Sequence, residues 1–344
     1  MSRTRRLGIA VGRIGLVLVG LVLGIGLLEW ALYAFNIERL PFTNPDLYRS
    51  DPEVGYAMKP NVRVYSHGTW FETNKHGFRG PDWEEACAAQ RRCVMFLGDS
   101  VTVGFGVDFE ESLAGRFTAL NRQGMVGISL AVSGLNAEQE FLLAERHSGS
   151  IQPRAIVLVF VSNDFEPPYP IFESRIDPPD DRGWLVPVKR WLRRHSVLYS
   201  FSRKRLRALL GTPSGPVAEW EDPDLSGNSP ESRARFLKFE EGLAGLVRNN
   251  SAPVLLCAFS PGIPPSGRRL LEEIASRSGA VWVDLGGGLW KDKEDYLANS
   301  ALGWDSHPNA AALDRMARLI TTAVEKTLAA QGSRPPASSD SGDP

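Results

Sequence analysis

Five apolar runs of strand length constrain the fold of this chain more than any other feature. They occupy residues 94–97, 128–132, 155–161, 253–259 and 280–285. None alternates between apolar and polar residues, so each is expected to be covered on both faces, as in a parallel sheet. Segments with helical spacing separate the runs. This order predicts a three-layer α/β/α sandwich whose central sheet is mostly parallel and five-stranded.

The helical segments follow the spacing of their apolar side chains. We expect helices over residues 110–122, 136–147, 231–249, 266–278 and 309–331. Ligands of such sheets bind beyond the carboxyl ends of the strands. Polar residues that directly follow a strand are therefore the first candidates for a functional site.

An apolar segment precedes the predicted domain. Residues 16–28 carry no charge, and about 22 residues from Ile14 to Phe35 contain only Glu29 as a charged side chain. A bilayer core requires roughly 20 such residues. Four arginines come before or at the start of this segment: Arg3, Arg5, Arg6 and Arg13. By the positive-inside rule, the N-terminus stays in the cytoplasm and the rest of the chain crosses the membrane.

A cleaved signal peptide is the alternative for this segment. Its apolar region should be roughly 7–15 residues long and end at a small-x-small site. The run here is longer, no such site follows, and no cysteine is present there for lipidation. We expect residues 1–36 to be a cytoplasmic stub and a single-pass anchor in the bacterial inner membrane. Glu29 is expected at the membrane interface, and the main domain in the periplasm or extracytoplasmic space.

Charge and cysteines narrow the class of protein. A net charge of -1 gives no support to nucleic-acid binding. Cys87 and Cys93 can pair in an oxidising compartment, or both stay free while Cys93 opens a strand; the sequence leaves both open. Cys257 is expected in a buried strand. Metal-binding spacing such as C-x-x-C is absent.

The chain divides by composition into an anchor and three further parts. Residues 37–92 are expected to form a connector whose short strands pack on the domain at 93–331, and residues 332–344 a disordered tail. An insertion at 165–230 mixes basic with aromatic and aliphatic residues, which predicts one or two basic amphipathic helices. These helices either pack on the domain with a solvated face or contact anionic lipid headgroups or an acidic glycan.

Gly98-Asp99-Ser100 follows the first strand directly. A tight turn there can expose the Ser100 hydroxyl at the ligand-binding edge of the sheet, and nearby backbone N–H groups can stabilise an oxyanion. Taken alone, the tripeptide fits a serine that only caps a helix.

A second motif, Asp305-Ser306-His307-Pro308-Asn309, lies about 200 residues later, before the last helix. A histidine needs a carboxylate to fix its tautomer before it can deprotonate a serine, and Asp305 is two residues away. The alternative is a capping loop, in which Asp305 or Asn309 caps the helix. The chain has only five histidines, so the motif and Ser100 together predict a catalytic pair.

Two more strand ends carry hydrogen-bond donors. Gly134 follows the second strand and Asn163 follows the third. The Gly134 N–H and the Asn163 amide can face the same crevice as Ser100. Each alone would be an ordinary turn, but the three together predict an oxyanion hole.

These four motifs resemble the SGNH hydrolase superfamily, also called GDSL lipases and esterases, in its membrane-anchored bacterial form. The resemblance covers roughly residues 93–330, and the residues that give the family its name correspond to Ser100, Gly134, Asn163 and His307. Residues 74–79 also resemble anchored members and are expected near the mouth of the active site.

The chain departs from the family pattern twice. Ser162 precedes Asn163-Asp164, where the family has Gly-x-Asn-Asp. The last family motif is D-x-x-H-P, whereas Trp304 stands at that acid position here and Asp305 gives D-x-H-P. Asp305 remains the predicted acid, and Asp284, after the fifth strand, is an outside candidate.

The resemblance implies acyl transfer without a metal or cofactor. Ser100 would attack an ester carbonyl, with His307 as general base and Asp305 orienting it. The N–H groups of Ser100 and Gly134 and the side chain of Asn163 would stabilise the oxyanion.

The predicted function is that of an exported esterase acting on an acyl, in particular acetyl, ester of a carbohydrate or lipid. An O-acetyltransferase that modifies an extracytoplasmic polysaccharide is the close alternative, because only the acceptor differs. A membrane-anchored binding module without catalysis is the alternative from another class, and the joint presence of Ser100, Asn163 and His307 argues against it.

Overall fold

Two units make up the chain in the computed structural model, which describes residues 3–35, 44–88, 92–171, 184–209, 224–259, 261, 263–303 and 305–332. The smaller unit combines Met1–Phe42 with Pro179–Glu219, and the larger combines Thr43–Pro178 with Trp220–Pro344. Much of the predicted insertion at 165–230 thus groups with the N-terminal helix. Trp304 and the predicted tail after Gly332 lie outside the described residues.

The larger unit contains the predicted parallel sheet. Its strands are β5 (Cys93–Leu97), β6 (Val126–Ser129), β7 (Ala155–Phe160), β8 (Val254–Ala258) and β9 (Val281–Asp284). They lie in the order β6-β5-β7-β8-β9, and all four pairings are parallel. The predicted α/β class is confirmed. The strand order reverses beside β5, which is the point where such sheets bind ligands.

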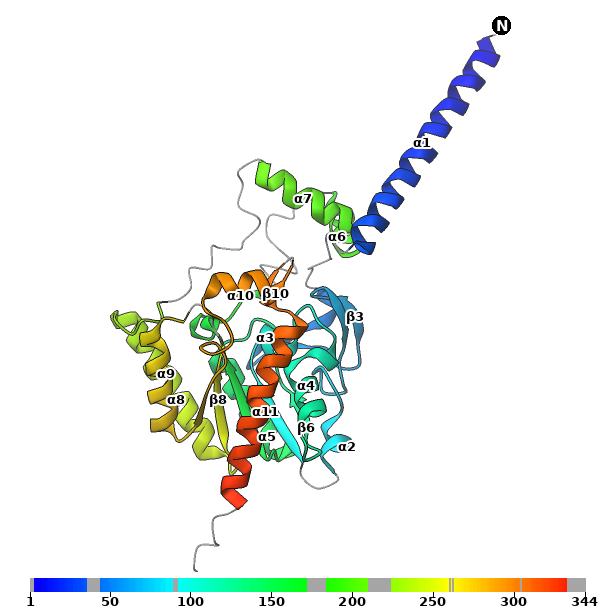
Figure 1. Cartoon of the computed structure of the whole chain (residues 1–344). Helices are drawn as coiled ribbons and strands as arrows, with labels where there is room; N and C mark the ends of the chain where they lie inside the picture. Colours follow the sequence, from blue (N-terminus) through cyan, green and yellow to red (C-terminus); the bar gives the residue numbers. More distant parts are fainter. Residues whose placement is uncertain are drawn as a thin grey trace, which may run out of the picture. The chain divides into compact units, whose positions relative to one another are not determined.

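Helices cover both faces of this sheet (Figure 1). The helices are α5 (Ala137–Ile151), α8 (Pro230–Asn249) and α9 (Pro265–Ser278) on one face, and α4 (Leu113–Leu120) and α11 (Ala310–Gly332) on the other. Met95 and Leu97 of β5 belong to the core under α5, whereas Val94 and Phe96 belong to the core under α11. Because each strand feeds two cores, its sequence is apolar without alternation.

Several boundaries differ from the predicted ones for local reasons. The second strand spans Val126–Ser129, and residues 130–132 are buried beyond its end; the sequence pattern detects burial and not the end of the strand. The helix predicted at 110–122 is divided into η2 (Phe109–Glu111) and α4, since the Ser112 hydroxyl accepts from the Gly115 N–H and starts a new helix. Short elements were missed: α3 (Ser100–Val103), η3 (Ser162–Phe165), α10 (Lys293–Asn299), β10 (Ala301–Leu302) and β11 (Asp305–Pro308).

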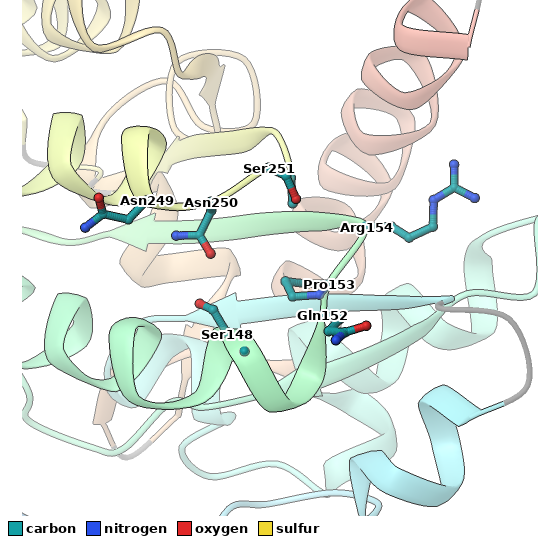
Figure 2. A pocket seen from close by; sticks show the side chains of 9 residues that line it. Ser148, Gln152, Pro153, Arg154, Asn249, Asn250 and Ser251 are labelled. Carbon is teal, nitrogen blue, oxygen red and sulfur yellow. The ribbon is translucent and has the colours of Figure 1, made fainter.

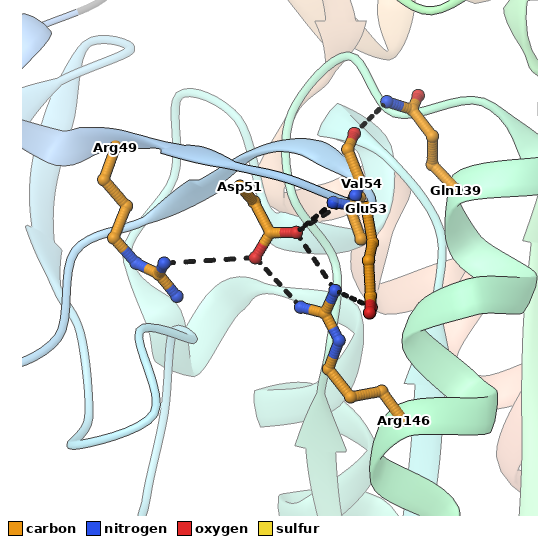
Figure 3. A network of polar contacts seen from close by, with 6 residues as sticks. All are labelled: Arg49, Asp51, Glu53, Val54, Gln139 and Arg146. Atoms are coloured by element: carbon orange, nitrogen blue, oxygen red, sulfur yellow. Dashed lines mark hydrogen bonds and ion pairs between the residues drawn. The ribbon is translucent and has the colours of Figure 1, made fainter.

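The connector is a folded part of the larger unit. It contains η1 (Pro45–Leu47), the hairpins β1 (Tyr48–Asp51) with β2 (Gly55–Met58) and β3 (Arg63–Ser66) with β4 (Thr69–Glu72), and α2 (Trp83–Ala88). Both Asp51 oxygens accept from Arg146 of α5 at 3.0 Å, and Gln139 donates to the Val54 carbonyl at 2.5 Å (Figure 3). The Arg146 guanidinium holds the pKa of Asp51 well below its usual value. These contacts fix the first hairpin to α5.

The three cysteines form one disulfide and one free thiol. Cys87 at the end of α2 forms a disulfide with Cys93, the first residue of β5. Of the two states the sequence left open, the structure therefore contains the bonded one. Cys257 is a free, buried thiol in β8, as predicted.

The smaller unit consists of the N-terminal helix α1 (Arg3–Ala34) and the helices α6 (Val186–His195) and α7 (Val197–Leu209). The 23 residues Gly12–Ala34 are long and apolar enough to cross a membrane, a property that anchors and signal sequences share. Glu29 accepts hydrogen bonds from the Ser196 hydroxyl at 2.9 Å and from the N–H groups of Val197 and Leu198. Glu29, which the sequence assigned only to the membrane interface, thus caps the N-terminus of α7.

Candidate active site

The turn after β5 presents Ser100 as the first residue of α3. Gly98 has a φ of +149°, and a Cβ there would collide with Thr102, so only glycine fits. Asp99 accepts from the Val101 N–H at 3.0 Å and caps α3. The serine is therefore not the capping residue, as the alternative interpretation required. Ser100 is 8% exposed and lies at the carboxyl end of β5.

His307 and Asp305 meet this serine from the hairpin β10–β11. The distance from His307 Nε2 to Ser100 Oγ is 2.8 Å, and that from His307 Nδ1 to Asp305 Oδ1 is 2.5 Å. Asp305 Oδ1 also accepts from the His307 backbone N–H at 3.0 Å. Asp305 and His307 are two residues apart in β11, so their side chains lie on the same face of the strand. The carboxylate of Asp305 can therefore reach Nδ1 of His307.

Neighbouring groups leave the histidine free for this role. The Phe105 ring stacks on the imidazole with centroids 4.0 Å apart, which fixes its plane. Asn309 accepts from the Ala312 N–H at 2.9 Å and caps α11, so capping does not require Asp305. Asp284, the outside candidate for the acid, accepts from the N–H groups of Gly286 and Gly287 in the turn after β9. Asp284 is therefore engaged elsewhere.

The predicted oxyanion donors follow the strands that flank the serine. Among the described residues, none accepts a hydrogen bond from the backbone N–H of Ser100 or Gly134. Gly134 has a φ of +84°, and a Cβ there would lie 2.8 Å from the Tyr56 hydroxyl oxygen. Asn163 Nδ2 donates to Asp99 Oδ2 at 2.9 Å. One amide hydrogen of Asn163 is used in this bond, and the second is available to a ligand.

Asp99 thus contacts two groups of the site. Its Oδ2 atom accepts from Asn163 and lies 3.0 Å from Ser100 Oγ. The serine hydroxyl has a single proton, which either Asp99 or His307 can accept. The nucleophilic state is the one in which the proton points to His307.

Two buried carboxyl groups lie behind Asp99. Asp164 Oδ2 accepts from the Val161 N–H at 2.9 Å, while Asp164 Oδ1 and both Glu140 carboxyl oxygens have no partner among the described residues. Burial raises the pKa of both carboxyls well above the usual values, and the nearby charge of Asp99 raises them further. Asp164 and Glu140 therefore hold a proton to a higher pH than exposed carboxyls do.

The connector forms the other wall of the site. Arg79, 2% exposed, donates to the carbonyls of Val103 and Gly104 at the end of α3, at 3.1 and 3.0 Å, and to those of Trp70 and Val107. Burial lowers the pKa of Arg79 to about 10, so it remains charged. Residues 74–79, expected near the mouth of the site, thus contact the helix that begins at Ser100 through their last residue.

Two more connector residues reach the site, and no sequence motif announced them. The Tyr56 hydroxyl donates to the Ser133 carbonyl at 2.9 Å, beside Gly134. The His67 ring packs against Phe105 with centroids 4.8 Å apart, behind His307. The sequence predicted that the connector packs on the domain, but not which of its residues reach the site.

Two further features lie away from the triad. His76, Asp82 and Glu84 of the connector offer ligand atoms within 4.8 Å of one another, but Lys75 Nζ is 3.1 Å from Glu84 and supplies a cation already. A polar cleft of about 640 Å³ lies at the amino ends of β7 and β8, with Ser148, Gln152, Asn250 and Ser251 among its lining residues (Figure 2). It is at the opposite edge of the sheet from Ser100.

A serine, a histidine and a carboxylate joined in this order form the triad of a serine hydrolase. No family model and no curated protein matches the chain. Solved structures do: the psychrotrophic esterase EstA from Pseudoalteromonas sp. is 13% identical, with a TM-score of 0.39, over 69% of this chain and 99% of its own.

Two further similar structures are those of an esterase and of a lipolytic protein. The acetylxylan esterase Axe2 from Geobacillus stearothermophilus is 14% identical, with a TM-score of 0.38, over 68% of this chain and 94% of its own. A member of the lipolytic G-D-S-L family from Veillonella parvula is 13% identical, with a TM-score of 0.38, over 67% and 96%. The group expected from the motifs is thus among the structures similar to this chain. At these sequence identities and TM-scores, the activity has to be inferred from the site itself.

Proposed function

We propose that this protein is an exported, membrane-anchored ester hydrolase that works through an acyl-serine intermediate. The observation that carries the proposal is the chain of hydrogen bonds from Ser100 Oγ through the His307 ring to Asp305. A protonated Nδ1 facing Asp305 leaves Nε2 as the acceptor of the serine proton. The arrangement therefore supports proton removal from the nucleophile.

The first half of the reaction acylates the serine. Ser100 Oγ attacks the ester carbonyl carbon while His307 Nε2 takes the hydroxyl proton, and Asp305 stabilises the imidazolium. The oxyanion is stabilised by the N–H groups of Ser100 and Gly134 and by the free hydrogen of Asn163. The tetrahedral intermediate collapses, His307 gives its proton to the leaving alkoxide, and the alcohol departs.

The second half restores the enzyme. Water attacks the acyl-serine carbonyl as His307 takes one of its protons. Collapse of the second intermediate releases the carboxylic acid, and the proton returns to Ser100 Oγ.

A small acyl group, such as acetyl, on a carbohydrate or lipid fits this site best. The space beside Gly134 is narrow, since a Cβ on that residue would lie 2.8 Å from Tyr56 and 3.4 Å from the Tyr169 ring. The Tyr56 hydroxyl and the Tyr169 ring, this close to an oxyanion donor, leave little room for a long acyl chain. The alcohol portion of the ester lies outside this constraint.

Retention of α1 as an anchor is the second part of the proposal. The positive charges before Gly12–Ala34 support a cytoplasmic N-terminus and an extracytoplasmic catalytic unit. The disulfide Cys87–Cys93 supports the same location, because such bonds persist in oxidising compartments.

The experiment uses the full chain in a mild detergent. We expect turnover of p-nitrophenyl acetate, slower turnover of the octanoate ester, and covalent labelling of Ser100 by a fluorophosphonate. Ser100→Ala is the matched control and should lose both. A folded protein that neither turns over nor is labelled would favour a binding module instead. Mass spectrometry of an oligosaccharide added with an acetyl donor separates the hydrolase from an O-acetyltransferase.

A further inference from the structure

Helix α6 has two chemically different sides. Basic residues occupy positions 189, 190, 193 and 194, which fall on one side at 100° per residue. The opposite side, with the turn that precedes it, exposes apolar side chains: Trp184 (87%), Leu185 (41%), Val188 (52%) and Trp191 (58%). Two exposed tryptophans beside aliphatic residues indicate a surface that meets an apolar partner.

The Glu29 cap relates this surface to the apolar helix α1. Glu29 bonds the first turn of α7, and α7 follows α6 without an intervening loop except Ser196. Glu29 lies five residues before the end of Gly12–Ala34, or about 7–8 Å along the helix axis. The start of α7 is therefore held at the depth where hydrocarbon gives way to headgroups.

Side-chain burial at this junction is consistent with that depth. Leu32 of α1 and Val197 of α7 are buried, although the rest of α1 from Gly12 is largely exposed. Trp30 and Tyr33 remain 60% and 62% exposed on the other sides of α1. Tryptophan and tyrosine are enriched at membrane–water interfaces, where one part of the ring is apolar and another is polar.

We propose that α6 and α7 form a membrane-surface platform that binds anionic phospholipid headgroups. The apolar side of α6 enters the boundary between headgroups and acyl chains, and its basic side faces lipid phosphates. The proposal rests on α1 being a retained anchor. A lipid surface fits better than an acidic glycan, because a glycan offers the tryptophans no hydrocarbon partner.

The test reads the depth of single fluorophores on the full chain in nanodiscs. The native thiols do not interfere, since Cys87 and Cys93 are bonded and Cys257 is buried. An NBD fluorophore is attached at Val188→Cys in α6, at Leu21→Cys in α1 and at Leu237→Cys, an exposed position of α8. Lipids with a nitroxide near the headgroup then quench fluorophores at the surface of the bilayer, and lipids with a nitroxide at the end of an acyl chain quench those near its centre, where Leu21→Cys is expected.

We expect the Val188→Cys fluorophore to be quenched several-fold more than the one at Leu237→Cys. Its quenching should grow when phosphatidylglycerol is added to phosphatidylcholine, and the increase should disappear at high salt. Equal quenching at positions 188 and 237, with strong quenching at Leu21→Cys, would overturn the platform but leave the anchor intact. Absence of quenching at Leu21→Cys would contradict the anchor itself.

Two other results also decide against the proposal as stated. Quenching at position 188 that ignores lipid charge would overturn the assignment of anionic headgroups. A fluorophore at Val188→Cys that ignores lipid but responds to polygalacturonate would replace the lipid by an acidic glycan.

Discussion

The residues on the two sides of Ser100 differ in exposure and in what they contact. On one side a short hairpin brings His307 and Asp305, whose side chains are 24% and 29% exposed. On the other, Tyr56 and Arg79 of the connector are 3% and 2% exposed and donate to backbone carbonyls. The first side holds groups that change protonation, and the second holds groups that keep the backbone in place. Substitutions should therefore change the rate on the first side and stability on the second.

Of the substitutions beside Ser100, Asp305→Asn is expected to lower the rate most. An asparagine can present an N–H to Nδ1 and so favour the wrong tautomer of His307, which costs about 10⁴-fold in kcat in a comparable triad. Stability should change little, because Asp305 is partly exposed. The measurement is kcat for p-nitrophenyl acetate.

Asp284→Asn is the control for this change, since the contacts of Asp284 are with the turn after β9 and, at 3.9 Å, with Arg268. Its kcat per folded molecule should stay near that of the parent. A comparable loss in both variants would remove Asp305 from its assigned role.

Asn163→Ala comes next. Loss of one oxyanion donor typically lowers kcat by about 10²–10³-fold, or roughly 3–4 kcal/mol. The rate of fluorophosphonate labelling should fall with it, because the phosphonyl oxygen uses the same donors. A loss below about 10-fold in both rates would show that the remaining amide hydrogen of Asn163 does not reach the reacting group.

Arg79→Lys probes the connector side. A lysine cannot donate to four carbonyls at once, so buried acceptors lose partners and the free energy of unfolding should fall by about 2–3 kcal/mol. The activity of the molecules that remain folded should fall only a few-fold. Thermal unfolding followed by near-UV circular dichroism measures the first effect. The control is Arg63→Lys, at an exposed ion pair with Glu72.

The same contrast explains what could be predicted from the sequence. Ser100, Gly134, Asn163 and His307 each follow a recognisable apolar run or adjoin a proline, so their positions relative to the sheet were inferable. The connector contacts were not, because Arg79 acts on carbonyls, which every residue has, and nothing in the sequence indicates which carbonyls lie within reach. Tertiary packing alone brings Arg79 to the end of α3.

Very short elements could not be predicted from the sequence for another reason. The hairpin β10–β11 pairs two residues with four and includes a bulge, so it has no periodicity that a sequence pattern can detect. The role of Glu29 could not be predicted either. Its position in the apolar segment predicts a place at the membrane interface, but only the fold shows that it caps a helix more than 160 residues later.

The smallest effect on the rate is expected from Glu140→Gln, on the buried side, which instead changes how stability depends on pH. Burial raises the pKa of Glu140 well above its ordinary value of 4.5, so the folded chain holds this proton to a higher pH than the unfolded chain does. As pH rises above 4.5, the unfolded chain loses this proton while the folded chain keeps it, so the parent loses stability with increasing pH. Glutamine has no such proton to lose. The variant should therefore match the parent near pH 4 and become relatively more stable toward pH 8, by at most about 1.4 kcal/mol per pH unit.

Unfolding curves across this range measure the difference, with Glu138→Gln, an exposed residue of the same helix, as the control. Parallel stability profiles of parent and Glu140→Gln between pH 5 and 8 would mean that Glu140 is ionised in the folded protein.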